Sequence, residues 1–195
     1  MARRANFKFD NQLIHVQSEY VNYMKINEDN LEIQLVEQLT DWTKKLVQDL
    51  RDKNITLGTA ESCTGGLLSS YLTLHPGASE IFFGSIVSYA NSVKEKLLNV
   101  KAETFKKFGA VSLETANQMA EGCLKQLEVK VAVSITGIAG PGGGSPQKPV
   151  GTVFIAVTGV NRETNVFEHH FLGDRKQIQL QACVEAVKHL SGFIK

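Results

Sequence analysis

The stretch that most constrains the fold runs from Thr59 to Gly66, where an apolar segment gives way to hydroxyl groups, a thiol and two adjacent glycines. The segment Ile55–Ala60 is short and partly β-branched, which predicts a buried strand. The apolar positions of Leu67–Leu72 suit a helix. A strand that turns through glycine into a helix leaves unpaired N–H groups at the positive end of the helix dipole. Such a turn can hold a phosphate, a carboxylate or an oxyanion, and Ser62 is expected at its mouth.

The composition is that of an ordinary globular protein. The 195 residues are 43% hydrophobic and 21% charged, which fits one substantial α/β domain. The 21 Lys and Arg residues nearly balance the 20 Asp and Glu residues, and the two signs are interspersed. This balance gives no electrostatic reason to expect nucleic acid or an anionic membrane as a partner, whereas small-molecule chemistry remains open.

The chain has no apolar run approaching the roughly 20 residues that a membrane span needs, and its basic start lacks the apolar segment of a signal peptide. We therefore expect a cytoplasmic protein. Three cysteines, Cys63, Cys123 and Cys183, are odd in number and far apart, which fits neither a disulfide framework nor the paired spacing of a zinc site. Cys123 and Cys183 are expected to be small core residues, because free cysteine is among the most buried residue types.

The expected organisation is an N-terminal lead over residues 1–30 followed by a single domain over residues 31–195. The lead mixes weak alternation, as in Leu13–Val16, with Gln, Asn and Lys, and is expected to be partly ordered or to form an arm that packs on a neighbour. From Leu31 to Arg51 apolar residues recur mostly at intervals of three to four. This spacing predicts an amphipathic helix with Trp42 as a core anchor.

The remaining elements follow from alternation, periodicity and capping signals. The expected strands are Ile81–Ala90 and Lys130–Thr136, with a hairpin formed by Val150–Val157 and Thr164–Phe171. Three expected helices have no named cap: Leu67 to about Leu74, Ala102–Phe108 and Asp174–Phe193. Two others have a cap residue: one starts at a cap formed by Asn91 or Ser92, and one covers Leu113–Leu127 after a cap at Ser112.

Unusual polar groups stand at the exits of three expected strands. They are Ser62, Cys63 and Thr64 at the first, Tyr89 and Lys94 at the second, and Thr136 with a Gly-rich loop over residues 137–149 at the third. In an open α/β sheet, ligands gather at such strand ends. A nucleophilic serine needs a base beside it, and none of the three stretches contains a histidine. Lys94 is then the best available base, provided that burial or a nearby cation lowers its pKa from about 10.4, and Tyr89 is expected to share or relay the proton.

Each of these residues also has an ordinary structural interpretation. Neither the Gly-x-Ser-x-Gly elbow nor the Ser-x-x-Lys spacing occurs at this site, and Ser62 is equally well explained as a helix cap. Lys94 can be a solvated helix residue and Tyr89 a strand aromatic with a wet hydroxyl. Cys63 is a rival nucleophile, since a thiol at a helix N-terminus can have a lowered pKa. It ranks below Ser62 because no histidine or third orienting group is nearby.

The Gly-rich loop matches neither a Walker motif nor the Gly-x-Gly-x-x-Gly fingerprint that opens a helix. Its backbone can still form an anion nest, with Lys148 or Arg175 adding positive charge. A mobile surface loop is the alternative interpretation of the same composition.

Six ordered blocks carry a family resemblance. They are Thr59–Gly66, the segment from Gly84 through Ser88 and Tyr89 to Lys94, Gly109–Ser112, Gly137–Gly143, Lys148–Val153 and Gly173–Arg175. Together they closely resemble the CinA C-terminal domain family, over roughly Leu31 to the C-terminus. Members of that family include nicotinamide-nucleotide amidohydrolases, which convert nicotinamide mononucleotide to nicotinic acid mononucleotide and ammonia. Some members sit behind a larger N-terminal domain.

The resemblance implies a three-layer α/β/α sandwich with a mixed sheet, no metal, no cofactor, a small nucleotide substrate and a homo-oligomer. It implies a serine amidase in which Ser62 attacks the carboxamide while Lys94, with Tyr89 nearby, handles protons. The substrate-binding residues it implies are Cys63, Thr64, Gly65, Gly66, Thr136, Gly137, Gly140, Lys148 and Arg175, with backbone N–H groups of the Thr64–Gly66 turn and the Gly137 loop holding the oxyanion or the phosphate. A non-catalytic nucleotide-binding or regulatory module and an amidase with another substrate are the alternatives.

Overall fold

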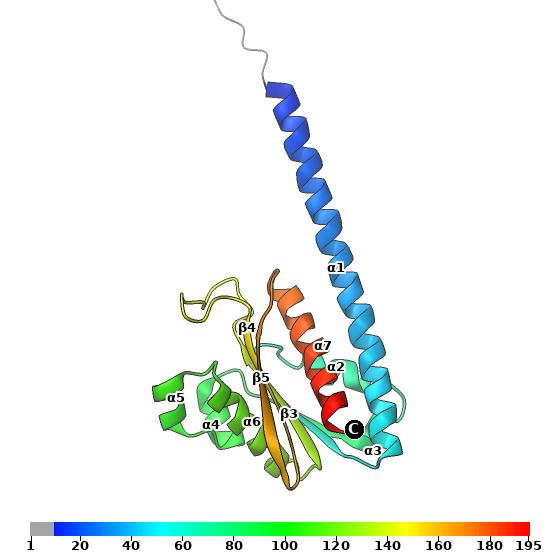
Figure 1. The fold of residues 1–195 in the computed structure, drawn as a ribbon, viewed down its shortest axis with the longest axis vertical. Coiled ribbons are helices and arrows are strands. Elements are labelled where there is room, and N and C mark those ends of the chain that lie inside the picture. The colour runs from blue at the N-terminus through cyan, green and yellow to red at the C-terminus, as the bar shows by residue number, and fades with distance from the viewer. Residues whose placement is uncertain (1–9) are drawn as a thin grey trace, which may run out of the picture.

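The computed structural model describes residues 10–195, with side chains from Asn30 onward (Figure 1). The strands are β1 (Leu57–Glu61), β2 (Phe82–Val87), β3 (Val131–Gly137), β4 (Thr152–Gly159) and β5 (Arg162–His170). The helices are α1 (Asp10–Asp52), α2 (Leu67–Thr73), α3 (Ala78–Ile81), α4 (Asn91–Leu98), α5 (Ala102–Phe108), α6 (Leu113–Gln126) and α7 (Arg175–Phe193).

The five strands form one mixed sheet in the order β2-β1-β3-β4-β5. β1 is parallel to both of its neighbours, β2 and β3, whereas β4 and β5 add an antiparallel hairpin to the side of β3. Because β1, β2 and β3 run in one direction, their carboxyl ends lie at the same edge of the sheet. The mixed sheet is as expected, and this edge is where the three polar strand exits must meet.

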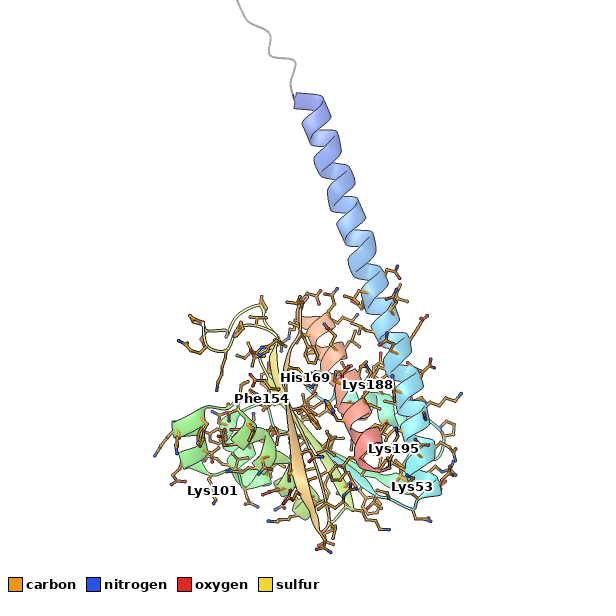
Figure 2. All side chains as sticks on the ribbon, in the orientation of Figure 1. Lys53, Lys101, Phe154, His169, Lys188 and Lys195 are labelled. Carbon is orange, nitrogen blue, oxygen red and sulfur yellow. The ribbon has the colours of Figure 1, made fainter. Side chains whose placement is uncertain are left out.

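Helices cover both faces of the sheet, which confirms the expected three-layer sandwich (Figure 1). One layer contains α1, α2 and α7, where α1 packs on α7 and α7 lies over β3 and β4. The other layer contains α4, α5 and α6, where α6 lies over β1, β3 and β4 and supports α4. Apolar side chains fill both spaces between helices and sheet (Figure 2), including the expected core residues Cys123 and Cys183.

The first helix is longer than expected. α1 begins at Asp10 instead of Leu31, so the weakly alternating stretch Leu13–Val16 is helical. No Gly or Pro interrupts residues 10–34, so nothing ends the helix once its later turns are fixed by packing. Those later turns bury leucines at helical spacing, among them Leu39, Leu46 and Leu50. Figure 1 shows the earlier turns projecting beyond the sandwich, and residues 1–9 of the expected lead lie outside the described residues.

Two predictions about helix starts have different outcomes. Ser112 caps α6 as expected, since its hydroxyl accepts the Thr115 N–H. The predicted cap of α4 at Asn91 or Ser92 is wrong, because the N-cap is Ala90 and no side chain caps this helix. The Ala90 carbonyl accepts the N–H of Lys94 instead. The strand predicted over Ile81–Ala90 is shorter in the structure, because the short helix α3 includes Ile81 and β2 ends at Val87.

We predict that Gly122→Ala destabilises the fold by displacing α4, the helix that carries Lys94. A Cβ at Gly122 would lie 2.0 Å from the backbone oxygen of Leu98. Overpacking of this kind costs about 1–3 kcal/mol, which lowers Tm by roughly 3–10 °C for a chain of this size. Gly192→Ala in α7 is the matched control, because a Cβ there meets no atom within 4 Å. Thermal unfolding measures Tm for both variants and the parent. An equal Tm for Gly122→Ala and the parent would contradict the tight α4–α6 contact.

Candidate functional site

The three strand exits converge on one cavity of about 240 Å³. Its wall includes Ser62 and Cys63 after β1, Tyr89, Asn91 and Lys94 after β2, Thr136, Gly137 and Gly140 at and after β3, Ala110 and Val111 before α6, and Arg175 at the start of α7. The structure therefore brings together side chains from segments that are more than one hundred residues apart. Asn91, Ala110 and Val111 were not predicted as site residues: Asn91 was expected only as a helix cap, and Ala110 and Val111 appeared only in the block Gly109–Ser112 of the family resemblance.

Ser62 follows β1 directly and presents its hydroxyl to the cavity. Its backbone N–H donates to the Ile135 carbonyl at 2.9 Å, which continues the pairing of β1 with β3 by one residue. The side chain is 8% exposed. It does not cap α2, because the N-cap of that helix is Gly66 and the N–H groups at the helix start donate to Glu61 instead of Ser62. The capping interpretation of Ser62 is therefore wrong.

Lys94 is the largest fully buried polar side chain in the described part of the chain, with 1% of its surface exposed. Its Nζ lies 3.0 Å from the Ser62 Oγ, 2.6 Å from the Ser88 carbonyl oxygen and 3.2 Å from the Tyr89 carbonyl oxygen. Burial disfavours the ammonium form and lowers the pKa of Lys94 to about 8. A solvated helix lysine would keep its ordinary pKa, so this interpretation of Lys94 does not fit.

These three partners match the bonding capacity of a neutral amine. Carbonyl oxygens can only accept, so the Ser88 and Tyr89 carbonyls take two N–H donors from Nζ. The nitrogen lone pair is then left for the third partner, and the Ser62 hydroxyl is able to donate its proton to it. The same contacts also suit an ammonium that donates to all three oxygens. The pair is thus built for proton exchange between Oγ and Nζ.

Glu61 occupies the helix start that was expected to bind an anion. Its carboxylate is completely buried and accepts the backbone N–H groups of Gly66, Leu68 and Ser69 at 2.8–3.2 Å. It also accepts the Thr64 hydroxyl at 2.8 Å. A carboxylate at a helix N-terminus is stabilised by the dipole and by these donors. The sequence signal for this role is an acidic residue at the end of the strand, a few residues before the helix.

The backbone cradle expected at Thr64, Gly65 and Gly66 is corrected accordingly. The Gly66 N–H is taken by Glu61, and the Gly65 N–H donates to the Ser62 carbonyl at 3.1 Å. Within the part of the chain that the structure describes, the amides of Cys63 and Thr64 donate to no other residue. Anion binding at this turn is therefore left to the two residues that directly follow Ser62.

Cys63 is not activated in the way a thiol at a helix start can be. Its side chain is buried, and the resulting desolvation raises the pKa of the thiol to about 12. The helix dipole that would favour a thiolate is already paired with the Glu61 carboxylate, whose charge also raises the Cys63 pKa. At neutral pH the thiol stays protonated and is a weak nucleophile.

Tyr89 contributes its two polar groups to different partners. Its carbonyl oxygen contacts Lys94, whereas its phenol, on a side chain that is 61% exposed, accepts a hydrogen bond from Arg175 Nη2 at 2.7 Å. Arg175 Nη1 donates to the Gly140 carbonyl at 2.7 Å. The phenol bonds neither Ser62 nor Lys94, so the structure gives no direct support for a proton relay through Tyr89. Arg175 instead links the second and third strand exits across the mouth of the cavity.

Thr136 and Lys148 support the wall of the cavity. The Thr136 hydroxyl donates to the Ala110 carbonyl at 2.8 Å. Lys148 donates to the carbonyls of Phe108 and Val111 at 2.7 and 2.6 Å, and its side chain does not line the cavity. The expectation that Lys148 adds charge to an anion site is therefore corrected: its ammonium ties the Gly-rich loop to the connection between α5 and α6.

The described residues contain no group of three or more His, Cys, Asp or Glu side chains placed to hold a metal ion. In the same part of the chain, no helix combines the length and the apolar character needed to span a bilayer.

Comparisons with known proteins identify the family. Residues 39–194 match the CinA C-terminal domain. A CinA-like protein from Leptospira interrogans is 53% identical over 131 residues, and a putative competence-damage inducible protein from Clostridioides difficile is 47% identical over 152 residues. These matches cover 67% and 78% of this chain but only 31% and 35% of the relatives, so the chain spans about a third of their length.

Solved structures agree with this assignment. The competence/damage inducible protein CihA from Agrobacterium tumefaciens superposes with a TM-score of 0.80 and 37% identity, over 81% of this chain and 96% of that one. A CinA superfamily protein from Escherichia coli gives a TM-score of 0.76 and 31% identity, over 80% and 90% of the two chains. The chain therefore belongs to the CinA C-terminal domain family.

Proposed function

We propose that this protein is a serine amidohydrolase that converts nicotinamide mononucleotide and water to nicotinic acid mononucleotide and ammonia. One observation supports this type of reaction most directly: the Ser62 Oγ lies 3.0 Å from the Nζ of Lys94, a buried lysine whose pKa is lowered to about 8. A serine becomes a nucleophile when a base of suitable pKa is within hydrogen-bond reach. The nucleotide substrate is carried over from the family resemblance of the sequence blocks.

In the proposed first half-reaction, neutral Lys94 takes the Ser62 hydroxyl proton as Oγ bonds to the carboxamide carbon. The carbonyl oxygen gains negative charge, and the amides of Cys63 and Thr64, which donate to no other described residue, are the backbone donors that follow the nucleophile directly in the chain. The carbon–nitrogen bond then breaks, and the Lys94 ammonium returns its proton to the departing nitrogen, which leaves as ammonia.

In the second half-reaction, water attacks the acyl carbon of the ester on Ser62. Neutral Lys94 takes a proton from this water and returns it to the Ser62 oxygen as the ester bond breaks. The products are the carboxylic acid, which ionises in solution, and the regenerated Ser62 hydroxyl. One amide and one water are thus converted to one acid and one ammonia.

The mouth of the cavity suits a substrate with an anionic end. The Arg175 guanidinium bonds two neutral oxygens and, among the described residues, no carboxylate, so its charge is uncompensated. A second hollow of about 500 Å³ adjoins the cavity and shares Ala139, Gly140 and Arg175 with it. The smaller cavity is proposed to receive the carboxamide ring and the larger hollow the ribose phosphate.

We predict that Ser62→Ala lowers ammonia release from nicotinamide mononucleotide by at least about 10³-fold, because loss of a serine nucleophile removes the covalent route. Cys63→Ala is the matched control, since it removes the neighbouring thiol and keeps measurable turnover if Ser62 is the nucleophile. Full activity of Ser62→Ala together with an inactive Cys63→Ala would contradict the serine mechanism. Saturable nucleotide binding by the parent without turnover at any pH would favour the non-catalytic module.

We predict that kcat/KM rises with pH by about tenfold per unit up to about pH 8 and levels off above it. The sign follows because only the neutral amine accepts the serine proton, and the neutral fraction grows as pH approaches the lowered pKa. The measurement is ammonia release across that pH range, with Lys94→Met as the inactive reference. A profile that is flat through pH 8, or that falls as pH rises toward 8, would contradict Lys94 as the base.

A further inference from the structure

Gln179 lies on α7 and reaches the nucleophile turn, which we define as residues Ser62–Gly65. Its Nε2 donates to the Cys63 carbonyl oxygen at 2.6 Å, across 116 residues of sequence. The side chain is half-buried and also borders the larger hollow beside the cavity. The contact joins α7 to the turn that carries the proposed nucleophile.

Three carbonyl groups of the nucleophile turn, those of Ser62, Cys63 and Thr64, accept hydrogen bonds. The Ser62 carbonyl accepts the Gly65 N–H at 3.1 Å, and the Thr64 carbonyl accepts the Leu67 N–H at 3.1 Å. These two bonds are local, so they form wherever the turn forms. The third carbonyl, that of Cys63, is held by Gln179 from another element of the fold.

A bond to a peptide carbonyl also fixes the N–H of the same peptide. The peptide group is planar and trans, so its C=O and N–H point in opposite directions. Gln179 thus sets the plane of the Cys63–Thr64 peptide and with it the direction of the Thr64 N–H. That N–H has no partner among the described residues, and it belongs to the turn that carries the nucleophile.

We propose that Gln179 is a positioning residue that holds the Cys63–Thr64 peptide in the orientation needed to stabilise negative charge next to Ser62. The inference rests on the proposed amidase function. Without this bond the peptide is free to rotate, and donors that must be in place before charge develops are lost from the site. Gln179 acts through the backbone and has no role in proton transfer.

The test compares Gln179→Met with Gln181→Met. Methionine has a similar length and no hydrogen-bond donor, so each change removes one side-chain donor from α7. Gln181 is the matched control because it is also half-buried and its Nε2 donates to a backbone carbonyl outside the helix, that of Leu172, at 2.8 Å. This carbonyl is not part of the nucleophile turn.

Two measurements are needed for each full-length variant. The first is kcat and KM for ammonia release from nicotinamide mononucleotide. The second is the rate and final extent of labelling by a fluorophosphonate, in which Ser62 Oγ bonds to phosphorus, fluoride leaves and the hydroxyl proton passes to Lys94. Labelling reports the nucleophile and its charge-stabilising donors without requiring the natural substrate, and its final extent counts competent chains.

For Gln179→Met we expect kcat and the labelling rate constant to fall by about 10- to 100-fold, as for a misplaced or lost charge-stabilising donor. We expect KM to stay close to that of the parent. We also expect labelling to reach one group per chain, and this result would exclude misfolded protein as the cause of the slower reaction. Gln181→Met should match the parent in all four quantities.

Three outcomes would contradict the role of Gln179 without contradicting the proposed function. They are parent-like kcat and labelling in Gln179→Met, a raised KM with unchanged kcat in Gln179→Met, or an equal loss of kcat and labelling rate in Gln181→Met. A raised KM would make Gln179 a substrate contact of the larger hollow. A parent chain that is labelled but releases no ammonia would contradict the nucleotide substrate and leave the labelling comparison to decide on Gln179. A parent chain that neither reacts nor is labelled would overturn the proposed function and the inference together.

Discussion

The burial of one lysine amine between two carbonyl oxygens and a serine hydroxyl is the constraint on which the site depends. Lys94 reaches this position because α4 starts soon after β2, and β2 lies beside β1, the strand that ends directly before Ser62. α4 itself is held against α6 at a glycine, where no larger residue fits. The desolvation that burial imposes is what lowers the Lys94 pKa to about 8, so the packing of the second helical layer sets the pKa of the proposed base.

Glu61 shows how a charge can shape a site without entering it. Its buried carboxylate satisfies the N-terminal N–H groups of α2, so the helix dipole stabilises a protein group instead of a ligand. This fixes the path of the turn that carries Ser62. It also keeps Cys63 beside a fixed negative charge, which opposes thiolate formation and separates the roles of two adjacent nucleophilic residues.

The sequence was sufficient to predict much of this architecture. Local periodicity and glycines predict the Ser112 cap, the three polar strand exits and, apart from the short α3, the order of the strands and helices. The structure contains all of these features. Other features depend on which donors and acceptors meet in space. The bond from Arg175 to the Tyr89 phenol and the bonds from the Lys148 ammonium to two carbonyls join segments that no local pattern connects. The extension of α1 to Asp10 was missed for a different reason: polar helical residues resemble a loop when no apolar face marks them.

The proposed mechanism depends on Lys94 having a pKa of about 8 beside Ser62, and titration of the Lys94 amine tests this directly. Selective ¹³C and ¹⁵N labelling of lysine, with Lys94→Met to assign the signal, allows the Lys94 resonance to be followed by NMR as pH is raised. We expect a midpoint near pH 8, below that of the solvent-exposed lysines. A midpoint near the ordinary lysine value of about 10.4 would contradict it, because Lys94 would then be charged wherever the protein is expected to work.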